Sequence, residues 1–160
     1  MRESSLRPAG AFLAAEGLLA IHSQPLYYRR LMPLRGTPHQ GPTLVFLHEA
    51  LGCTAMWHAF PAQVATDTGL NAVSFDRAGY GRSPRAPHPR GKDYLHQEAE
   101  TVLPRVLERL DIRRAILVGH SDGGSIALLA AALPRTVVGI ATEAAHVFVE
   151  PLTRAGIRET

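Results

Sequence analysis

A serine between two glycines is the part of this sequence whose residue types best suit covalent chemistry. The segment VGHSDGG, residues 118–124, places Ser121 between Gly119 and Gly123. A serine hydroxyl attacks a carbonyl carbon when a general base removes its proton and an acidic side chain orients that base. Ser121 is therefore a candidate nucleophile, and it requires a base and an acid as partners.

Apolar residues on both sides of Ser121 predict a strand, a sharp turn and a helix. The strand covers residues 115–119 and the helix covers residues 122–133. In this setting the Gly-x-Ser-x-Gly pattern is typical of a nucleophile held at a tight strand-to-helix turn. Gly119 and Gly123 leave room that a Cβ would fill, and the helix N-terminus offers N–H groups to a developing oxyanion.

By itself the Gly-x-Ser-x-Gly pattern is a weak signal. Roughly one unrelated chain in twenty with this composition would contain it by chance. In that alternative the segment is a glycine-rich turn, and Ser121 caps the helix through its side-chain oxygen without any catalytic role. Loops that follow two other strands favour the catalytic interpretation.

The rest of the sequence alternates short apolar segments with amphipathic ones, which predicts an α/β fold: a mostly parallel sheet with helices on both faces. The continuous apolar run at 43–47 is typical of a buried parallel strand. A helix over 93–110 has one apolar face, and Pro104 should bend or break it. Further strands are expected at about 17–22, 26–32, 71–75 and 137–142, a helix at about 54–68, and a loop at 83–92.

Two loops follow predicted strands and carry polar side chains. HEALG, residues 48–52, follows the strand 43–47, and DRAGYGRS, residues 76–83, follows the strand 71–75. Together with the Ser121 turn they lie at the carboxyl ends of strands, where ligands bind in open α/β sheets. From about residue 43 onward the sequence resembles the α/β-hydrolase family. HEALG is similar to its His-Gly-x-x-Gly oxyanion loop, and DRAGYGRS to its Asp-x-Arg-Gly-x-Gly-x-Ser loop.

The resemblance implies a role for each matching residue. Ser121 would be the nucleophile, and the backbone N–H groups of Asp122 and Ala50 would donate hydrogen bonds to the oxyanion. His48 would brace the oxyanion loop as a buried, hydrogen-bonded residue rather than transfer protons. Glu49 departs from the glycine that the family usually has there, so its carboxylate is expected to point away from the oxyanion or to bind loop amides.

The loop at 76–83 is expected to have a structural role. Asp76 and Arg77 should fix neighbouring loops rather than take part in chemistry, and Gly79 and Gly81 should serve the turn. The resemblance implies neither a cofactor nor a metal ion, so none is expected.

The order of the catalytic triad in this family is serine, acid, histidine. The acid usually follows the seventh strand and the histidine the eighth, whereas this sequence predicts about six of the usual eight strands. The resemblance therefore implies that acid and base lie beyond Thr160. Residues 1–160 are then expected to be the N-terminal part of an α/β-hydrolase core domain, without the cap and the C-terminal catalytic segments.

Residues near the C-terminus offer an alternative pair of partners. Some family members place the acid after the sixth strand, so Glu143 is an alternative acid, and His146 is the one histidine after Ser121. Otherwise Glu143 and His146 are an ordinary loop carboxylate and loop histidine.

The function that these features predict is that of an esterase-like serine hydrolase, acting through an acyl-enzyme on a small-molecule substrate. Esters are the default substrates, and carbon–carbon bond hydrolysis and lactone opening use the same residues. A serine at 121 argues against the dehalogenase and epoxide-hydrolase branch, whose nucleophile is a carboxylate. The 160-residue chain is expected to be inactive alone. The alternative is a non-catalytic ligand-binding or interaction protein with the same fold.

The composition is that of a globular protein, with 46% hydrophobic and 19% charged residues. The 17 basic residues are scattered and the net charge is +3, so no nucleic-acid binding is expected. Cys53 is the single cysteine, which excludes an intramolecular disulfide. Glu16 interrupts the apolar residues 9–21, and no apolar run reaches the roughly 20 residues of a membrane helix. A cytoplasmic protein without a membrane span is expected.

An incomplete sheet should also affect assembly. The strand at 137–142 would form a bare edge, and apolar helix faces would be exposed. The 160 residues are therefore expected to be a fragment of a longer hydrolase or to self-associate through the exposed sheet edge. Light scattering should show association of the isolated chain, whereas a soluble monomer that melts cooperatively would contradict this expectation.

Overall fold

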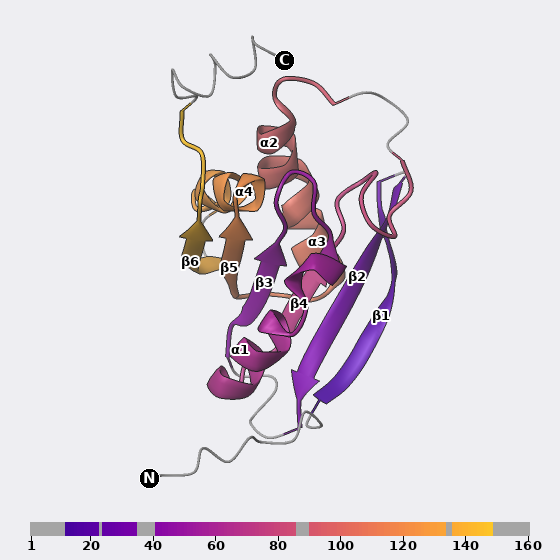
Figure 1. Cartoon of the computed structure of the whole chain (residues 1–160), viewed down its shortest axis with the longest axis vertical. Coiled ribbons are helices and arrows are strands. Elements are labelled where there is room, and N and C mark those ends of the chain that lie inside the picture. The colour runs from indigo at the N-terminus through magenta and orange to yellow at the C-terminus, as the bar shows by residue number, and fades with distance from the viewer. Residues whose placement is uncertain (1–11, 23, 35–40, 86–89, 134–135, 149–160) are drawn as a thin grey trace.

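The computed structural model describes residues 12–22, 24–34, 41–85, 90–133 and 136–148 of the chain. Within these ranges the strands are β1 (Phe12–Ile21), β2 (Gln24–Pro33), β3 (Thr43–Leu47), β4 (Ala72–Phe75), β5 (Ala115–His120) and β6 (Val137–Glu143). They form one sheet in the order β1-β2-β4-β3-β5-β6 (Figure 1). Strands β4, β3, β5 and β6 run parallel, and β1 and β2 add an antiparallel hairpin at one edge. The mostly parallel sheet predicted from the sequence is confirmed.

The helical segments are η1 (Thr54–Trp57), α1 (Phe60–Thr68), α2 (Tyr94–Gln97), η2 (Glu98–Val102), α3 (Leu103–Arg109) and α4 (Asp122–Ala130). Helix α1 lies on one face of the sheet, and α3 and α4 lie on the other (Figure 1). The predicted architecture, with helices on both faces, is therefore confirmed.

Strand β3 shows why a continuous apolar run suits the centre of this sheet. Successive side chains of a strand point to opposite faces. Leu44 and Phe46 contribute to the core under α1, together with Ala65. Val45 and Leu47 contribute to the core under α3 and α4. Because both faces are covered, all positions of β3 are buried.

The boundaries of the hairpin differ from the prediction. Strands were expected at about 17–22 and 26–32, but pairing runs continuously from Phe12 opposite Pro33 to Ile21 opposite Gln24. Much of β1 is exposed, so its first half lacks the regular apolar alternation by which a strand is recognised. The strands expected at 71–75 and 137–142 agree with β4 and β6 to within one residue.

Two expected helices are divided in the structure. The segment at 54–68 forms η1, a 3₁₀ helix, and then α1, because His58 between them has a left-handed φ of 48°. The segment at 93–110 changes from α2 to the π-helical turn η2 and back to α3. That turn ends at Val102, two residues before Pro104, which has no N–H to donate to the carbonyl of Glu100.

The helix after Ser121 is shorter than expected. It was predicted over 122–133, whereas α4 ends at Ala130 and the chain then turns, with Leu133 N donating to Ala130 O at 2.9 Å. This tighter bond, from residue i+3 to residue i, closes the helix before Pro134.

Strand β6 lies at the edge of the sheet in the described part of the chain and pairs with β5. Val138 and Ile140 on this strand are 43% and 40% exposed. Within the described residues this edge is bare, as the sequence predicted, and the strand also exposes apolar side chains, which was not predicted.

The burial of the central strands predicts where the fold is sensitive. Leu117 on β5 is fully buried, so Leu117→Ala should lower the free energy of unfolding by about 2–5 kcal/mol. Leu18 on β1 is 62% exposed, so the matched variant Leu18→Ala should change it by less than about 0.5 kcal/mol. Urea denaturation of the two variants and the parent measures both values. Equal losses would contradict the assignment of the core.

Candidate active site

Ser121 occupies a strained turn between β5 and α4. Its backbone has φ 52° and ψ −116°, a conformation that costs a non-glycine residue about 1–3 kcal/mol. Hydrogen bonds hold the backbone on both sides: Ser121 N donates to Glu143 O at 2.8 Å, and Ser125 N donates to Ser121 O at 3.0 Å. The turn therefore joins the ends of β5 and β6 to the first turn of α4.

The flanking glycines allow backbone atoms to meet directly. A Cβ at Gly119 would collide with the carbonyl oxygen of Gly123, and a Cβ at Gly123 would collide with the carbonyl oxygen of Leu47. The first turn of α4 therefore packs on the ends of β3 and β5 without side chains between them, which agrees with the room predicted from the sequence.

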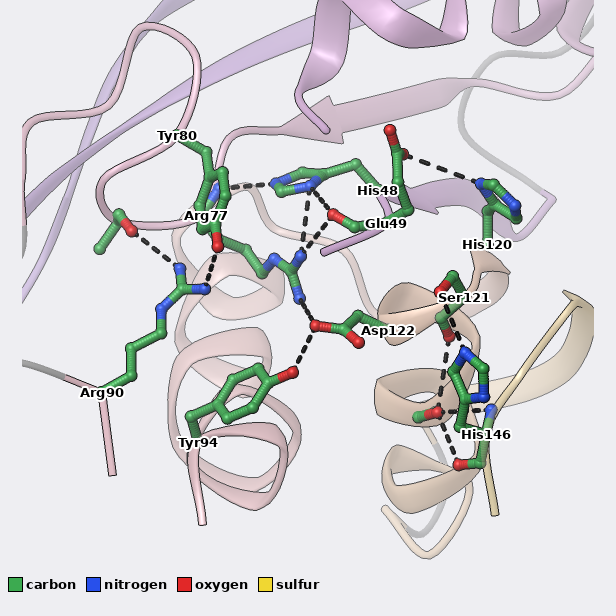
Figure 2. A network of polar contacts seen from close by, with 12 residues as sticks. His48, Glu49, Arg77, Tyr80, Arg90, Tyr94, His120, Ser121, Asp122 and His146 are labelled. Atoms are coloured by element: carbon green, nitrogen blue, oxygen red, sulfur yellow. Dashed lines mark hydrogen bonds and ion pairs between the residues drawn. The ribbon is translucent and has the colours of Figure 1, made fainter. Parts of the chain in front are cut away.

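The hydroxyl of Ser121 does not cap the helix. Its side chain makes no capping hydrogen bond to α4, and Oγ lies 3.4 Å from Nε2 of His146 (Figure 2). The alternative in which Ser121 acts as a side-chain N-cap is therefore wrong. The hydroxyl instead faces an imidazole, a group that can accept its proton.

His146 is fixed in place by Ser125. Ser125 Oγ donates to the carbonyl oxygen of His146 at 2.7 Å and accepts a hydrogen bond from His146 N at 2.9 Å. This pair of hydrogen bonds joins the segment after β6 to the first turn of α4, and no motif in the sequence indicates it.

Glu143 approaches Ser121 with its backbone and not with its carboxylate. Its carbonyl oxygen accepts the hydrogen bond of Ser121 N, while its side chain is exposed. In the described part of the chain, that carboxylate makes no hydrogen bond or ion pair with His146. The structure thus brings His146 to Ser121 but leaves the alternative acid apart from both.

His48 is a neutral brace, as expected. It is buried, and Arg77 N donates a hydrogen bond to its Nε2 at 3.1 Å. A backbone N–H is a donor only, so the ring proton must be on Nδ1, which donates to Glu49 O at 2.8 Å. Burial, followed by the charge of Arg77, lowers the pKa of His48 from 6.5 to about 4.

The carboxylate of Glu49 faces His120, a pairing that no sequence pattern indicates. Oε2 lies 3.8 Å from Nδ1 of His120, the residue before the serine, and the carboxylate packs closely on Gly52 (Figure 2). Glu49 therefore connects the loop that follows β3 with the end of β5.

Asp76 and Arg77 fix loops. The buried carboxylate of Asp76 accepts hydrogen bonds from Thr54 N at 2.5 Å and Arg82 N at 2.8 Å, so it joins two loops. Arg77 Nη2 donates to Glu49 O at 2.7 Å, and Nη1 lies 3.8 Å from Oδ2 of Asp122. Arg77 therefore connects the loop of Ala50 with the start of α4 (Figure 2).

Tyr94 belongs to the same network, although no sequence motif indicated it. From the start of α2 its hydroxyl donates to Oδ2 of Asp122 at 2.5 Å. Burial and this carboxylate raise the pKa of Tyr94 to about 12, which keeps the hydroxyl protonated as a donor. Asp122 thus has an ordered side chain directly after Ser121.

Residues of the types that bind metals do not gather in the described ranges. No group of at least three His, Cys, Asp or Glu side chains there is arranged to hold an ion. In the same part of the chain, each helix is too short or too polar to cross a bilayer.

The lowered pKa of His48 predicts acid sensitivity. The unfolded chain protonates this histidine below about pH 6.5, whereas the native state resists protonation down to about pH 4. Stability should therefore fall as the pH decreases through that window, by roughly 3 kcal/mol in total from this group. Urea denaturation at several pH values should show a shallower fall for His48→Gln. An identical pH dependence in both proteins would contradict the buried neutral state.

Comparison with known proteins identifies relatives for this arrangement. The family model for the alpha/beta hydrolase fold matches residues 42–156. Over 88 residues the chain is 30% identical to the sn-1-specific diacylglycerol lipase ABHD11 of Danio rerio. The aligned region covers 55% of this chain and 26% of that protein. Over 91 residues the chain is 33% identical to the zearalenone hydrolase of Bionectria ochroleuca. This aligned region covers 56% of this chain and 34% of that protein.

The fold is also similar to solved structures. A carboxylesterase of the thaumarchaeon Nitrososphaera gargenis matches with a TM-score of 0.72 at 22% identity, covering 89% of this chain and 51% of that one. The chain spans about a quarter to a third of the length of the two curated relatives. Since the family model matches most of the chain, the chain belongs to the alpha/beta hydrolase fold family.

Proposed function

We propose that the protein is a serine hydrolase, in which Ser121 attacks the carbonyl carbon of an ester or related compound and water releases the acyl-enzyme. The observation that carries this proposal is the strained backbone of Ser121, with a hydroxyl that makes no capping hydrogen bond to α4. A binding module gains nothing from such strain. The names of the relatives, a diacylglycerol lipase and a zearalenone hydrolase, support hydrolysis as the reaction class.

The N–H groups of Ala50 and Asp122 are the proposed donors to the oxyanion. Asp122 is the first residue of α4, so its N–H has no partner within the helix. Ala50 N donates no hydrogen bond among the described residues. Both groups are thus available to stabilise the negative charge that develops on the carbonyl oxygen.

The catalytic acid and base are proposed to lie beyond Thr160, in keeping with the greater length of the relatives. Residues 1–160 then form the N-terminal part of the core domain, and this chain alone is expected to be inactive. His146 is the alternative base, but no described carboxylate orients it. Glu143 stays the alternative acid only if its exposed side chain turns toward His146.

The surroundings of the site favour a small molecule with an apolar group. Leu51 after β3 is 90% exposed, and Val147 and Phe148 after β6 are 73% and 68% exposed. These residues follow strands whose carboxyl ends meet at the edge where Ser121 lies.

The proposed reaction needs no cofactor. A cytoplasmic location of the protein remains a prediction, and so does self-association through the exposed edge of β6.

Labelling with a fluorophosphonate tests the nucleophile. The product of the full reading frame should react at Ser121, because the probe reports an activated serine, and peptide mass spectrometry locates the adduct. Ser121→Ala should abolish labelling and lower kcat for a chromogenic ester by about a thousandfold or more. An unlabelled parent, with ester turnover equal in Ser121→Ala, would instead support the non-catalytic alternative.

Matched variants separate the candidates for acid and base. His146→Gln and Glu143→Gln should retain labelling if the partners lie beyond Thr160, since each replaces a titratable group by a neutral one of similar size. Loss of labelling in His146→Gln, at an unchanged melting temperature, would assign the base to this chain. Reading the frame past codon 160 shows whether an aspartate and a later histidine exist.

A further inference from the structure

The carbonyl oxygen of Glu49 is held by three donors. His48 Nδ1 donates at 2.8 Å, Arg77 Nη2 at 2.7 Å and Gly52 N at 3.2 Å. This carbonyl belongs to the same planar peptide group as the N–H of Ala50, so fixing the oxygen also fixes the direction of that N–H.

One of these donors carries a full positive charge. A hydrogen bond in which a cation is the donor is shorter and stronger than one between neutral groups. Successive hydrogen bonds in a chain also polarise one another. The Arg77 guanidinium draws electron density toward the carbonyl oxygen of Glu49. The N–H of Ala50, at the other end of the peptide group, becomes a better donor as a result.

The other arm of the same guanidinium approaches the second donor residue. Nη1 lies 3.8 Å from Oδ2 of Asp122, and Tyr94 donates to the same carboxylate oxygen. The Arg77 side chain is only 3% exposed, so its position is set by packing. Figure 2 shows it between the loop of His48 and Glu49 and the start of α4.

We propose that Arg77 is a positioning residue of the oxyanion site, which orients and polarises the Glu49–Ala50 peptide group and anchors Asp122 beside it. This inference rests on the proposed serine hydrolase function. It goes beyond that function because Arg77 acts through peptide groups and does not touch the substrate.

The charge of Arg77 also resolves a conflict at the site. A carboxylate directly after the nucleophile would repel a developing oxyanion. Arg77 and the hydroxyl of Tyr94 hold the Asp122 carboxylate on the side away from Ser121 (Figure 2). A lysine would keep the charge, but a single ammonium lacks the planar fork that reaches Glu49 and Asp122 together.

Steady-state kinetics of the full reading-frame product test this role. Arg77→Met should lower kcat for an ester by about 10- to 100-fold, less than the complete loss of an oxyanion donor, while KM stays within about twofold. Arg77→Lys should restore only part of kcat, because it returns the charge without the fork. Arg82→Met is the matched control from the same loop, with an exposed side chain, and should retain the parent kcat.

A spectroscopic readout makes the test independent of turnover. The amide ¹⁵N frequency of a residue responds to hydrogen bonding at the preceding carbonyl, so Arg77→Met should shift the Ala50 resonance upfield, and Arg82→Met should leave it unchanged. Tyr94→Phe, a milder change, should shift Asp122 but not Ala50. These spectra keep the proposal testable even if the Arg77 variants lose stability.

The outcomes separate this inference from the proposed function. A folded Arg77→Met protein with parent kcat and an unshifted Ala50 resonance would overturn the role of Arg77 and leave the serine hydrolase intact. A parent that neither labels at Ser121 nor hydrolyses esters would overturn both the hydrolase and the oxyanion role.

Discussion

The geometry of the site depends on a contact between backbone atoms. The first turn of α4 lies directly on the end of β3, because Gly123 has no side chain to separate it from the carbonyl of Leu47. This close approach forces the sharp turn at Ser121 and its left-handed φ. It also places the N-terminus of α4 next to the loop that begins at His48. The strained backbone conformation of Ser121 persists because packing on several sides of the residue fixes it.

Around this contact, buried polar groups hold the loops in position, whereas apolar packing holds the helices and strands elsewhere in the fold. The cores under α1 and under α3 and α4 hold the sheet through apolar contacts. At the carboxyl ends of the strands the connections are hydrogen bonds between loop backbone and the side chains of Asp76, Arg77 and His48. Such groups are costly to bury unless they are paired, so each one specifies the position of its loop. The loops are thereby rigid enough to present N–H groups in fixed directions.

The sequence predicted the architecture well, because periodicity reports burial. The apolar run of β3 indicated a strand covered on both faces, and the glycines around Ser121 indicated the turn. What it could not predict were features set by distant partners. The left-handed conformation of His58 that divides the expected helix has no local signal, and the exposed half of β1 lacks the alternation that marks a strand.

The same limit applies to the site. Motifs singled out Ser121, Asp122 and Ala50, since their residue types recur at fixed spacings. Tyr94 and the pairing of Glu49 with His120 became visible only in three dimensions, because each joins segments that are separate in the chain. For Glu143 the sequence was misleading in the opposite way. Its position after the sixth strand suggested a catalytic acid, but it contacts Ser121 through its backbone carbonyl and not through its carboxylate.

The double hydrogen bond between Ser125 and His146 has a mechanical consequence. The end of β6 is bonded to Ser121 through the backbone of Glu143, and the segment beyond the strand is bonded to the first turn of α4 through His146. Displacing residues 143–146 from α4 would therefore break three hydrogen bonds together: Ser121 N to Glu143 O, and the two between Ser125 and His146. The hydrogen bonds that hold the backbone of Ser121 and those that hold the imidazole beside it therefore restrain the same short segment, residues 143–146.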